Sequence, residues 1–135
     1  MPSQPLNTFL TTPIALIGAL PSVRQTHRDR VDHTLIPDNQ WPFVAVYPDD
    51  ARVIDNLSMA QDYDHSITVL IYGRTEDDCR EVREDIIDAI NANHTMSGSA
   101  INCWPSSLTT TWGMDQHGKR FIDAVMLTAK LRRYL

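Results

Sequence analysis

The sequence lacks the residue patterns that most directly indicate catalysis or metal binding. It has only two cysteines, Cys79 and Cys103, too few for a zinc site of paired cysteines, and we expect both to be buried free thiols rather than a disulfide or a reactive thiol. It contains no glycine-rich phosphate loop, no nucleophile-elbow serine and no histidine pair at helical spacing with a carboxylate base. From these absences we expect no catalytic site, no metal and no cofactor, and nothing in the sequence favours an enzyme.

Long hydrophobic runs and a strong positive charge are also missing. No stretch approaches the run of about 18 apolar residues that a membrane-spanning helix needs, so we expect no association with a membrane. The N-terminus does not have a basic segment followed by an apolar core, so we expect no signal peptide. The formal net charge is -5, and binding of duplex DNA usually needs a basic face, so free DNA is not expected as a main partner.

What the sequence does contain is typical of one small globular domain. Its 135 residues, 42% of them hydrophobic, predict a single domain with one core. Residues 1–12 are largely polar and carry two prolines, so we expect an N-terminal arm followed by the domain at residues 13–135. The arm is interpreted either as an extended segment or as the frayed start of the first helix. Thr12 and Pro13 are typical of the start of a helix, which Pro21 then ends.

The clearest strand lies within residues 62–73. Ile67, Val69 and Ile71 alternate with other residues, which predicts a strand with one apolar face that ends at Gly73. An amphipathic helix is predicted directly afterwards, because Thr75 is a favourable N-cap and a stripe of apolar residues follows at helical spacing. The stripe consists of Cys79, Val82, Ile86, Ala89 and Ile90.

A second apolar segment lies at residues 41–48. Its near-continuous apolar character predicts a strand buried on both faces, with Pro42 and Pro48 at its ends, since proline is poorly tolerated inside a sheet. We expect Trp41 to pack against the first helix, near Leu16 or Leu20. Three further strands are expected at residues 23–31 (a short edge strand), 101–112 (kinked at Pro105) and 120–134 (unusually long).

The order of these elements predicts an α+β fold. Most connections between the expected strands have the length of hairpins, which favours antiparallel pairing. We therefore expect an antiparallel or mixed sheet of four or five strands with the helices packed on one face.

Two local sequences, together with this order of elements, carry a resemblance to a known family. Residues 41–47 (WPFVAVY) resemble an apolar strand of the tail terminators of long-tailed phages, the minor tail protein U-like family. Residues 20–25 (LPSVRQ) resemble the link after the first helix in related tail completion proteins. In the family, the apolar strand is followed by a charged hairpin tip, a strand, a helix with an acidic start and two closing strands. Residues 14–135 resemble this order of elements.

The resemblance implies a structural virion protein. Family members form a hexameric ring that caps the tail tube, stops its elongation and joins it to the head-side connector or stopper protein. The implied location is the tail–neck junction of the virion, after assembly in the host cytoplasm, with DNA passing through the ring without specific binding. Two alternatives stay open: another neck or head–tail joining protein, and an unrelated small α+β binding or enzyme domain.

Two sets of residues are candidates for contacts in such an assembly. The connection at residues 49–62 mixes charged and apolar residues, which indicates either an exposed tip that contacts the tube or a neighbour, or a segment folded back on the core. Its candidate contact residues are Asp49, Asp50, Arg52, Ile54, Leu57 and Met59.

The second set consists of charges on the predicted helix and the last strand. Glu81, Glu84 and Asp88 continue an acidic stripe that starts at Asp77, and Lys130, Arg132 and Arg133 form a basic cluster. The stripe is interpreted as a solvated helix face, as the lining of the ring's lumen, or as the partner of the basic cluster across a subunit boundary.

Overall fold

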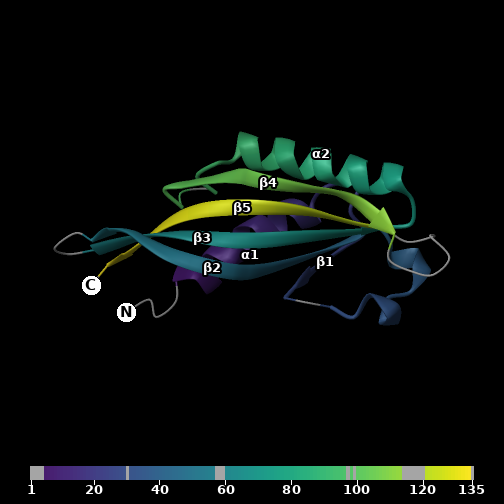
Figure 1. Cartoon of the computed structure of the whole chain (residues 1–135), viewed down its shortest axis with the longest axis horizontal. Helices are drawn as coiled ribbons and strands as arrows, with labels where there is room; N and C mark the ends of the chain where they lie inside the picture. Colours follow the sequence, from purple (N-terminus) through teal and green to yellow (C-terminus); the bar gives the residue numbers. More distant parts are fainter. Residues whose placement is uncertain are drawn as a thin grey trace.

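A five-stranded mixed sheet with two helices makes up the fold (Figure 1). The computed structural model describes residues 5–29, 31–56, 60–96, 98, 100–113 and 121–134, and for residues 5, 50, 52–56, 109–113, 133 and 134 it describes the backbone alone. The elements are α1 (Pro5–Gly18), β1 (Gln25–Arg28), η1 (His33–Leu35), η2 (Asp38–Gln40), β2 (Phe43–Asn56), β3 (Ala60–Gly73), α2 (Glu76–Ala92), β4 (Asn102–Gly113) and β5 (Phe121–Tyr134).

The strand order is β1-β2-β3-β5-β4. Only β1 and β2 pair in parallel, and the other neighbours are antiparallel. The expected α+β class, the mixed sheet and the placement of β1 at an edge are therefore confirmed. The expected kink in the strand after α2 is also found, as a shift of register between Pro105 and Ser107.

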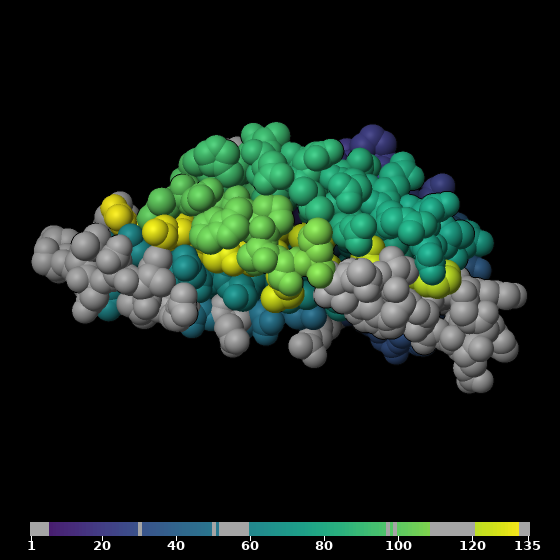
Figure 2. Space-filling view, turned by 45° about the horizontal axis from the view of Figure 1, so that its top comes forward, coloured from purple at the N-terminus to yellow at the C-terminus, as the bar shows by residue number. Residues whose placement is uncertain are grey.

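Both helices pack on one face of the sheet and form the main core with it. The predicted start of α2 is confirmed, because the Thr75 hydroxyl accepts a hydrogen bond from the Asp78 backbone N–H at 3.1 Å. Four residues of the apolar stripe of α2 are buried, as expected, namely Cys79, Val82, Ile86 and Ile90, and Ala89 is half-buried. In the space-filling view α2 and β4 cover this side of the molecule almost continuously, and only small parts of β5 are visible between them and the strands beneath (Figure 2).

The first helix begins earlier than the sequence predicts. Residues 5–12, expected to belong to an arm, form the first part of α1, and Phe9 and Leu10 are 1% exposed in the core. Residues 1–4 lie outside the described part of the chain. Pro5 is compatible with the first turn of a helix, where its missing N–H would have no partner. Pro13 does cost the helix a hydrogen bond, but the buried side chains of the preceding turn hold the helix in place.

Pro48 lies inside β2 rather than at its end, and residues 49–56 continue the strand instead of forming a loop. The reason is the short length of β1. Its pairing with β2 stops at Val46, whose carbonyl accepts a hydrogen bond from the Asp29 backbone N–H at 2.8 Å. Because backbone groups alternate along a strand, the Pro48 nitrogen points toward the same edge of β2 as the Val46 carbonyl. β1 has already ended at this level, so no neighbouring strand requires an N–H from residue 48.

Because β2 continues, the sheet extends beyond its helices. We call this extension the wing and define it as residues 53–56 of β2, 60–63 of β3 and 131–134 of β5, which pair side by side. The wing projects past the ends of α1 and α2, at the side of the molecule where the C-terminus lies (Figure 1). The three residues at the tip of the β2–β3 hairpin, 57–59, lie outside the described part.

Trp41 lies on the sheet face opposite the helices, so its expected contact with Leu16 or Leu20 is wrong. Its ring packs edge-on against Phe43, with 4.9 Å between ring centroids, and its indole N–H donates to the Ile36 carbonyl at 3.2 Å. The alternation of β2 explains the difference. Phe43 points away from the helices and Val44 points toward them, and Trp41 joins the cluster around Phe43.

Trp41 is 2% exposed, so its truncation is expected to be costly. Trp41→Ala should lower the free energy of unfolding by roughly 3–5 kcal/mol, the usual range for removing a buried tryptophan. Urea denaturation measures this value. Leu35→Ala, at a 77% exposed position of the same connecting segment, is the matched control and should change it by less than about 0.5 kcal/mol. Equal effects of the two variants would contradict the placement of Trp41.

Candidate functional site

The described residues show neither a metal-binding cluster nor a helix suited to a membrane. Among residues 5–29, 31–56, 60–96, 98, 100–113 and 121–134, no group of three or more His, Cys, Asp or Glu side chains could hold a metal ion. In the same part of the chain no helix is long and apolar enough to cross a bilayer. The candidate sites are therefore the charged surfaces and the strand edges, together with one buried polar cluster that connects a helix to the sheet.

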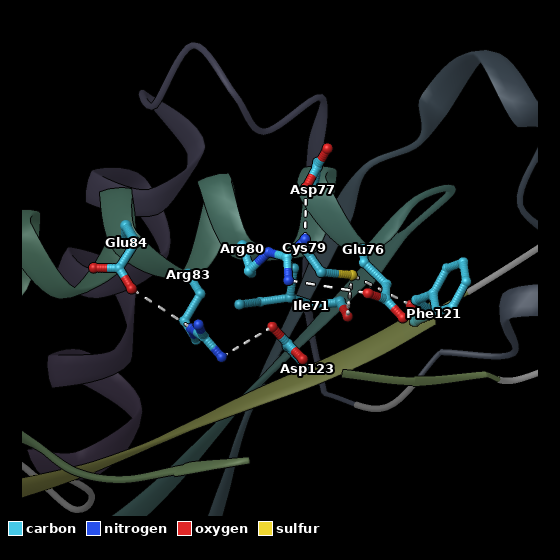
Figure 3. Close-up of polar contacts among 9 residues, drawn as sticks. All are labelled: Ile71, Glu76, Asp77, Cys79, Arg80, Arg83, Glu84, Phe121 and Asp123. Atoms are coloured by element: carbon cyan, nitrogen blue, oxygen red, sulfur yellow. Dashed lines mark hydrogen bonds and ion pairs between the residues drawn. The ribbon is translucent and has the colours of Figure 1, made fainter. Parts of the chain in front are cut away.

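The buried polar cluster joins α2 to β5. Asp123 has a fully buried side chain on the helix-facing side of β5, and an oxygen of its carboxylate lies 3.4 Å from a guanidinium nitrogen of Arg83 (Figure 3). The Arg83 guanidinium reaches down from α2 toward the sheet and also lies 3.8 Å from Glu84. This pair was not predicted from the sequence. The signal was an aspartate at a position of β5 where the alternation requires an apolar residue.

Cys79 lies beside this cluster, at the start of α2. Its thiol donates weakly to the carbonyls of Phe121 and Ile71, at 3.6 and 3.9 Å (Figure 3). Burial, helped by the negative charge of Asp123, raises the pKa of the Cys79 thiol to about 12. Burial likewise raises the pKa of Cys103 to about 12, and both cysteines are free and buried, as the sequence predicts. Neither thiol is poised as a nucleophile.

The predicted interface segment at residues 49–62 is mostly strand. Asp49 is exposed, while Asp50, Arg52 and Ile54 belong to β2, where the structure describes only their backbone. Leu57 and Met59 lie outside the described residues. The connection is therefore paired strand up to residue 56 and again from residue 60, and both the exposure of its tip and the role of that tip in contacts stay predictions.

The acidic stripe lies on the outer surface of α2. Glu81, Glu84 and Asp88 are all exposed, which agrees with a solvated helix face. Glu81 and Asp88 also border an open hollow of about 620 Å³ between α2 and the segment that follows α1. Its other lining residues are Leu20, Pro21, Ser22, Asp85 and Ala89, and the Ser22 hydroxyl donates to Asp85 at 2.6 Å.

The basic cluster has a partner within its own chain. Arg132 forms a two-pronged ion pair with Asp62 of β3, with N···O distances of 2.8 and 3.1 Å. This hydrogen bonding holds the pKa of the Asp62 carboxyl below its usual value, and the nearby Lys130 adds to the effect. Arg132 therefore has an acidic partner within its own chain, and the expected pairing of the basic cluster with acids of a neighbouring copy stays a prediction. Lys130 lies opposite Asp64 in the sheet, and the side chain of Arg133 is outside the described atoms.

The structure does not bring the acidic stripe and the basic cluster together within one chain. The stripe lies on α2, above the helix-covered face, whereas Asp62 and Arg132 share the opposite face with Tyr72 and Ile122. The molecule therefore has an acidic side, a mixed-charge side and a projecting wing. In class it is a small α+β domain whose most distinctive features are at its surface and strand edges.

No known family model matches the sequence, and no curated protein matches it. In structure the chain is similar to a chain of the virion of a native gene transfer agent particle, with a TM-score of 0.53 and 8% sequence identity. The similarity covers 93% of this chain and 92% of that chain. At this identity the likeness shows a shared fold, which extends over nearly the whole of both chains.

The Arg83–Asp123 pair gives a direct stability prediction. Arg83→Met should lower the free energy of unfolding by roughly 3–5 kcal/mol, because it removes the cation closest to a buried carboxylate. Urea denaturation measures the change. Arg80→Met is the matched control on the same helix, since the ion pairs of Arg80 are with the exposed acids Glu76 and Asp77 of α2 and its loss should matter by less than about 1 kcal/mol. The pair would have no structural importance if both variants were equally stable.

The raised pKa values predict how the thiols react. At pH 8 a thiol reagent should modify neither Cys79 nor Cys103 in the folded protein, because both thiols are buried and protonated. In urea both should react, since unfolding returns their pKa values to roughly 8.5. Absorbance of the released reagent measures the rates. Asp49→Cys, which places a thiol at an exposed position, is the control and should react at once. Rapid modification of the unaltered folded protein would contradict the prediction.

Proposed function

We propose that this chain is a tail terminator of a long-tailed phage or phage-like particle. In this role it is a structural protein, not an enzyme, and it forms a ring that caps the tail tube, stops elongation and joins the tube to the head-side connector. The observation that carries the proposal is the fold shared, over nearly the whole of both chains, with a chain of a gene transfer agent virion. The resemblance of residues 41–47 to a strand of the terminator family supports the finer assignment.

The shape of the molecule suits a ring subunit. A closed ring needs heterologous interfaces, in which one patch of a subunit meets a different patch of the next. The two edges of this sheet are unlike, with the short β1 at one side and the twelve-residue β4 at the other. The wing adds a projecting feature at one end, beyond the helices, where a tube or a connector has access to it (Figure 1).

The charges suit a conduit through which DNA passes. Each DNA phosphate that a protein neutralises adds affinity for DNA, because counterions are released. A conduit that lets DNA pass therefore benefits from few lysine and arginine side chains that are available to phosphates. The net charge is -5, the outer face of α2 is acidic, and Arg132 is held by Asp62. We place the stripe of Glu81, Glu84 and Asp88 either at the lumen of the ring or at a subunit boundary.

A second candidate is another neck or head–tail joining protein. The name of the structural neighbour specifies a virion but no position within it. The structural similarity is therefore compatible with a terminator and with another neck protein. Such a protein would bind the connector and not the end of the tube, so the two roles differ in the partner on which a ring forms.

Electron microscopy with isolated tail tubes and connectors tests the proposal. Tubes mixed with this protein should acquire one extra ring at an end and should not grow when tube protein is added. Rings on the connector, but never on tubes, would favour the second candidate. The absence of rings on both would contradict a role at the neck.

A charge-reversed variant tests which surface meets the tube. Asp49→Lys combined with Asp50→Lys alters the segment that leads into the wing. Asp49 is exposed, and substitutions at exposed positions usually change the free energy of unfolding by less than about 0.5 kcal/mol. If this surface contacts the tube, the variant should keep its melting temperature and lose capping. Normal capping by the folded variant would exclude this surface as the contact.

A further inference from the structure

A surface hollow between α2 and the segment that follows α1 combines an apolar lining with carboxylates. Its volume of about 620 Å³ lies within the range of roughly 300–1,000 Å³ that is typical of ligand pockets. The apolar part of the lining consists of Leu20, Pro21 and Ala89, and the carboxylates are those of Glu81, Asp85 and Asp88. The hollow is open to solvent, so it suits a side chain that enters from a partner better than an enclosed small molecule.

The cations of α2 are engaged away from the hollow. The helix contains two arginines and no lysine. Arg80 lies 2.6 Å from Asp77 on the same helix. Arg83 reaches toward the sheet, where it lies 3.4 Å from Asp123, and it also lies 3.8 Å from Glu84 (Figure 3). Both arginines of the helix therefore pair with carboxylates that do not line the hollow.

The carboxylates of the hollow have no such cation. In the part of the chain that the structure describes, Glu81, Asp85 and Asp88 form no ion pair. Asp85 accepts a hydrogen bond from the Ser22 hydroxyl at 2.6 Å, which orients this carboxylate but leaves its charge uncompensated. Residues three or four positions apart are neighbours on a helix, and like charges at this spacing destabilise it. A cation supplied by another molecule would relieve the repulsion.

We propose that the hollow is a docking site for an arginine-bearing segment of a separate protein. The aliphatic stem of an arginine suits the apolar lining, and its planar guanidinium can donate to two carboxylates at once. Among the residues that the structure describes, no group of three or more His, Cys, Asp or Glu side chains could hold a metal ion, so the three carboxylates do not converge on one point. A guanidinium with five donors, followed by a second cation along the same segment, matches carboxylates that are spread along a helix.

The engagement of the chain's own arginines favours a separate protein over a second copy. Arg28 donates to the Asn7 carbonyl at 2.9 Å, and Arg132 pairs with Asp62. Together with the two arginines of α2, these side chains already have partners and are not available to the hollow of a neighbouring copy. The hollow belongs to a single chain, so the inference goes beyond the proposed function and does not depend on the formation of a ring.

Peptide binding tests the inference with two triple variants that change the net charge equally. The probe is a fluorescent peptide in which two arginines alternate with glycines, and anisotropy measures its dissociation constant at about 0.05 M salt, where screening is weak. The hollow variant is Glu81→Gln, Asp85→Asn and Asp88→Asn, and the matched variant is Glu76→Gln, Asp77→Asn and Glu84→Gln. The hollow variant should bind the peptide about tenfold more weakly than the unaltered protein, because charge-assisted hydrogen bonds are lost. The matched variant should change the affinity by less than about twofold.

A second pair of variants tests the apolar part of the hollow without a change of charge. Ala89 is half-buried in the lining, and Ala89→Leu fills space that the stem of an arginine would occupy. Ala92 is exposed at the end of α2, and Ala92→Leu is the control. Peptide affinity should fall for Ala89→Leu and stay the same for Ala92→Leu, and melting temperatures show whether each variant is folded. Unchanged affinity of the folded Ala89→Leu protein would overturn the placement of the stem.

Other outcomes of the peptide experiment would overturn the docking site as a whole. These are equal weakening by the two triple variants, equal binding of a peptide in which uncharged citrulline replaces arginine, and no binding up to about 1 mM peptide. Self-association of the unaltered chain that the hollow variant abolishes would make a second copy the occupant and overturn the assignment to a separate protein. Capping of tail tubes is measured in a different experiment, so failure of the proposed function would leave the result for the hollow unchanged.

Discussion

The antiparallel ladder between β3 and β5 is the interaction on which the rest of the structure depends. Both strands have 14 residues and pair along their whole length without a shift of register. This pairing places Ile67 beside Leu127 and Val69 beside Val125, and so creates the apolar surface on which both helices lie. The ladder also determines which side chains meet at each end of the sheet, and the two ends differ greatly.

At one end the chain is closely packed. Gly73 ends β3 so near to α2 that a β-carbon there would lie 2.6 Å from the Cys79 sulfur, so a larger residue would displace the helix. The Arg83–Asp123 ion pair connects the same helix to β5. Removing both charges from water costs free energy, so such a pair is weak support for stability by itself. Its position suggests that it fixes the register of α2 on the sheet, because only one placement of the helix satisfies the buried carboxylate.

At the other end the strands outrun the helices that cover the rest of the sheet. This three-stranded extension still buries apolar side chains, since Ala60 is 4% exposed and Leu131 is 3% exposed. The bidentate Asp62–Arg132 pair strengthens the connection between β3 and β5 in this region. The two ends therefore differ: α2 is tied to the sheet at one end, and the strands project past the helices at the other.

Local patterns in the sequence by themselves determined most of the secondary structure. Alternation predicted β3 with the correct apolar face, and Thr75 with the apolar stripe after it predicted α2, because these signals act between residues only two to four positions apart. Only the tertiary structure decided the features that depend on contacts between residues far apart in the sequence. Asp62 meets Arg132 across 70 positions, Pro48 fits within β2 because β1 ends early, and α1 starts at Pro5 because Phe9 and Leu10 reach the core. No local period encodes strand order or register, so the ion pairs between distant residues are not visible until the chain is folded.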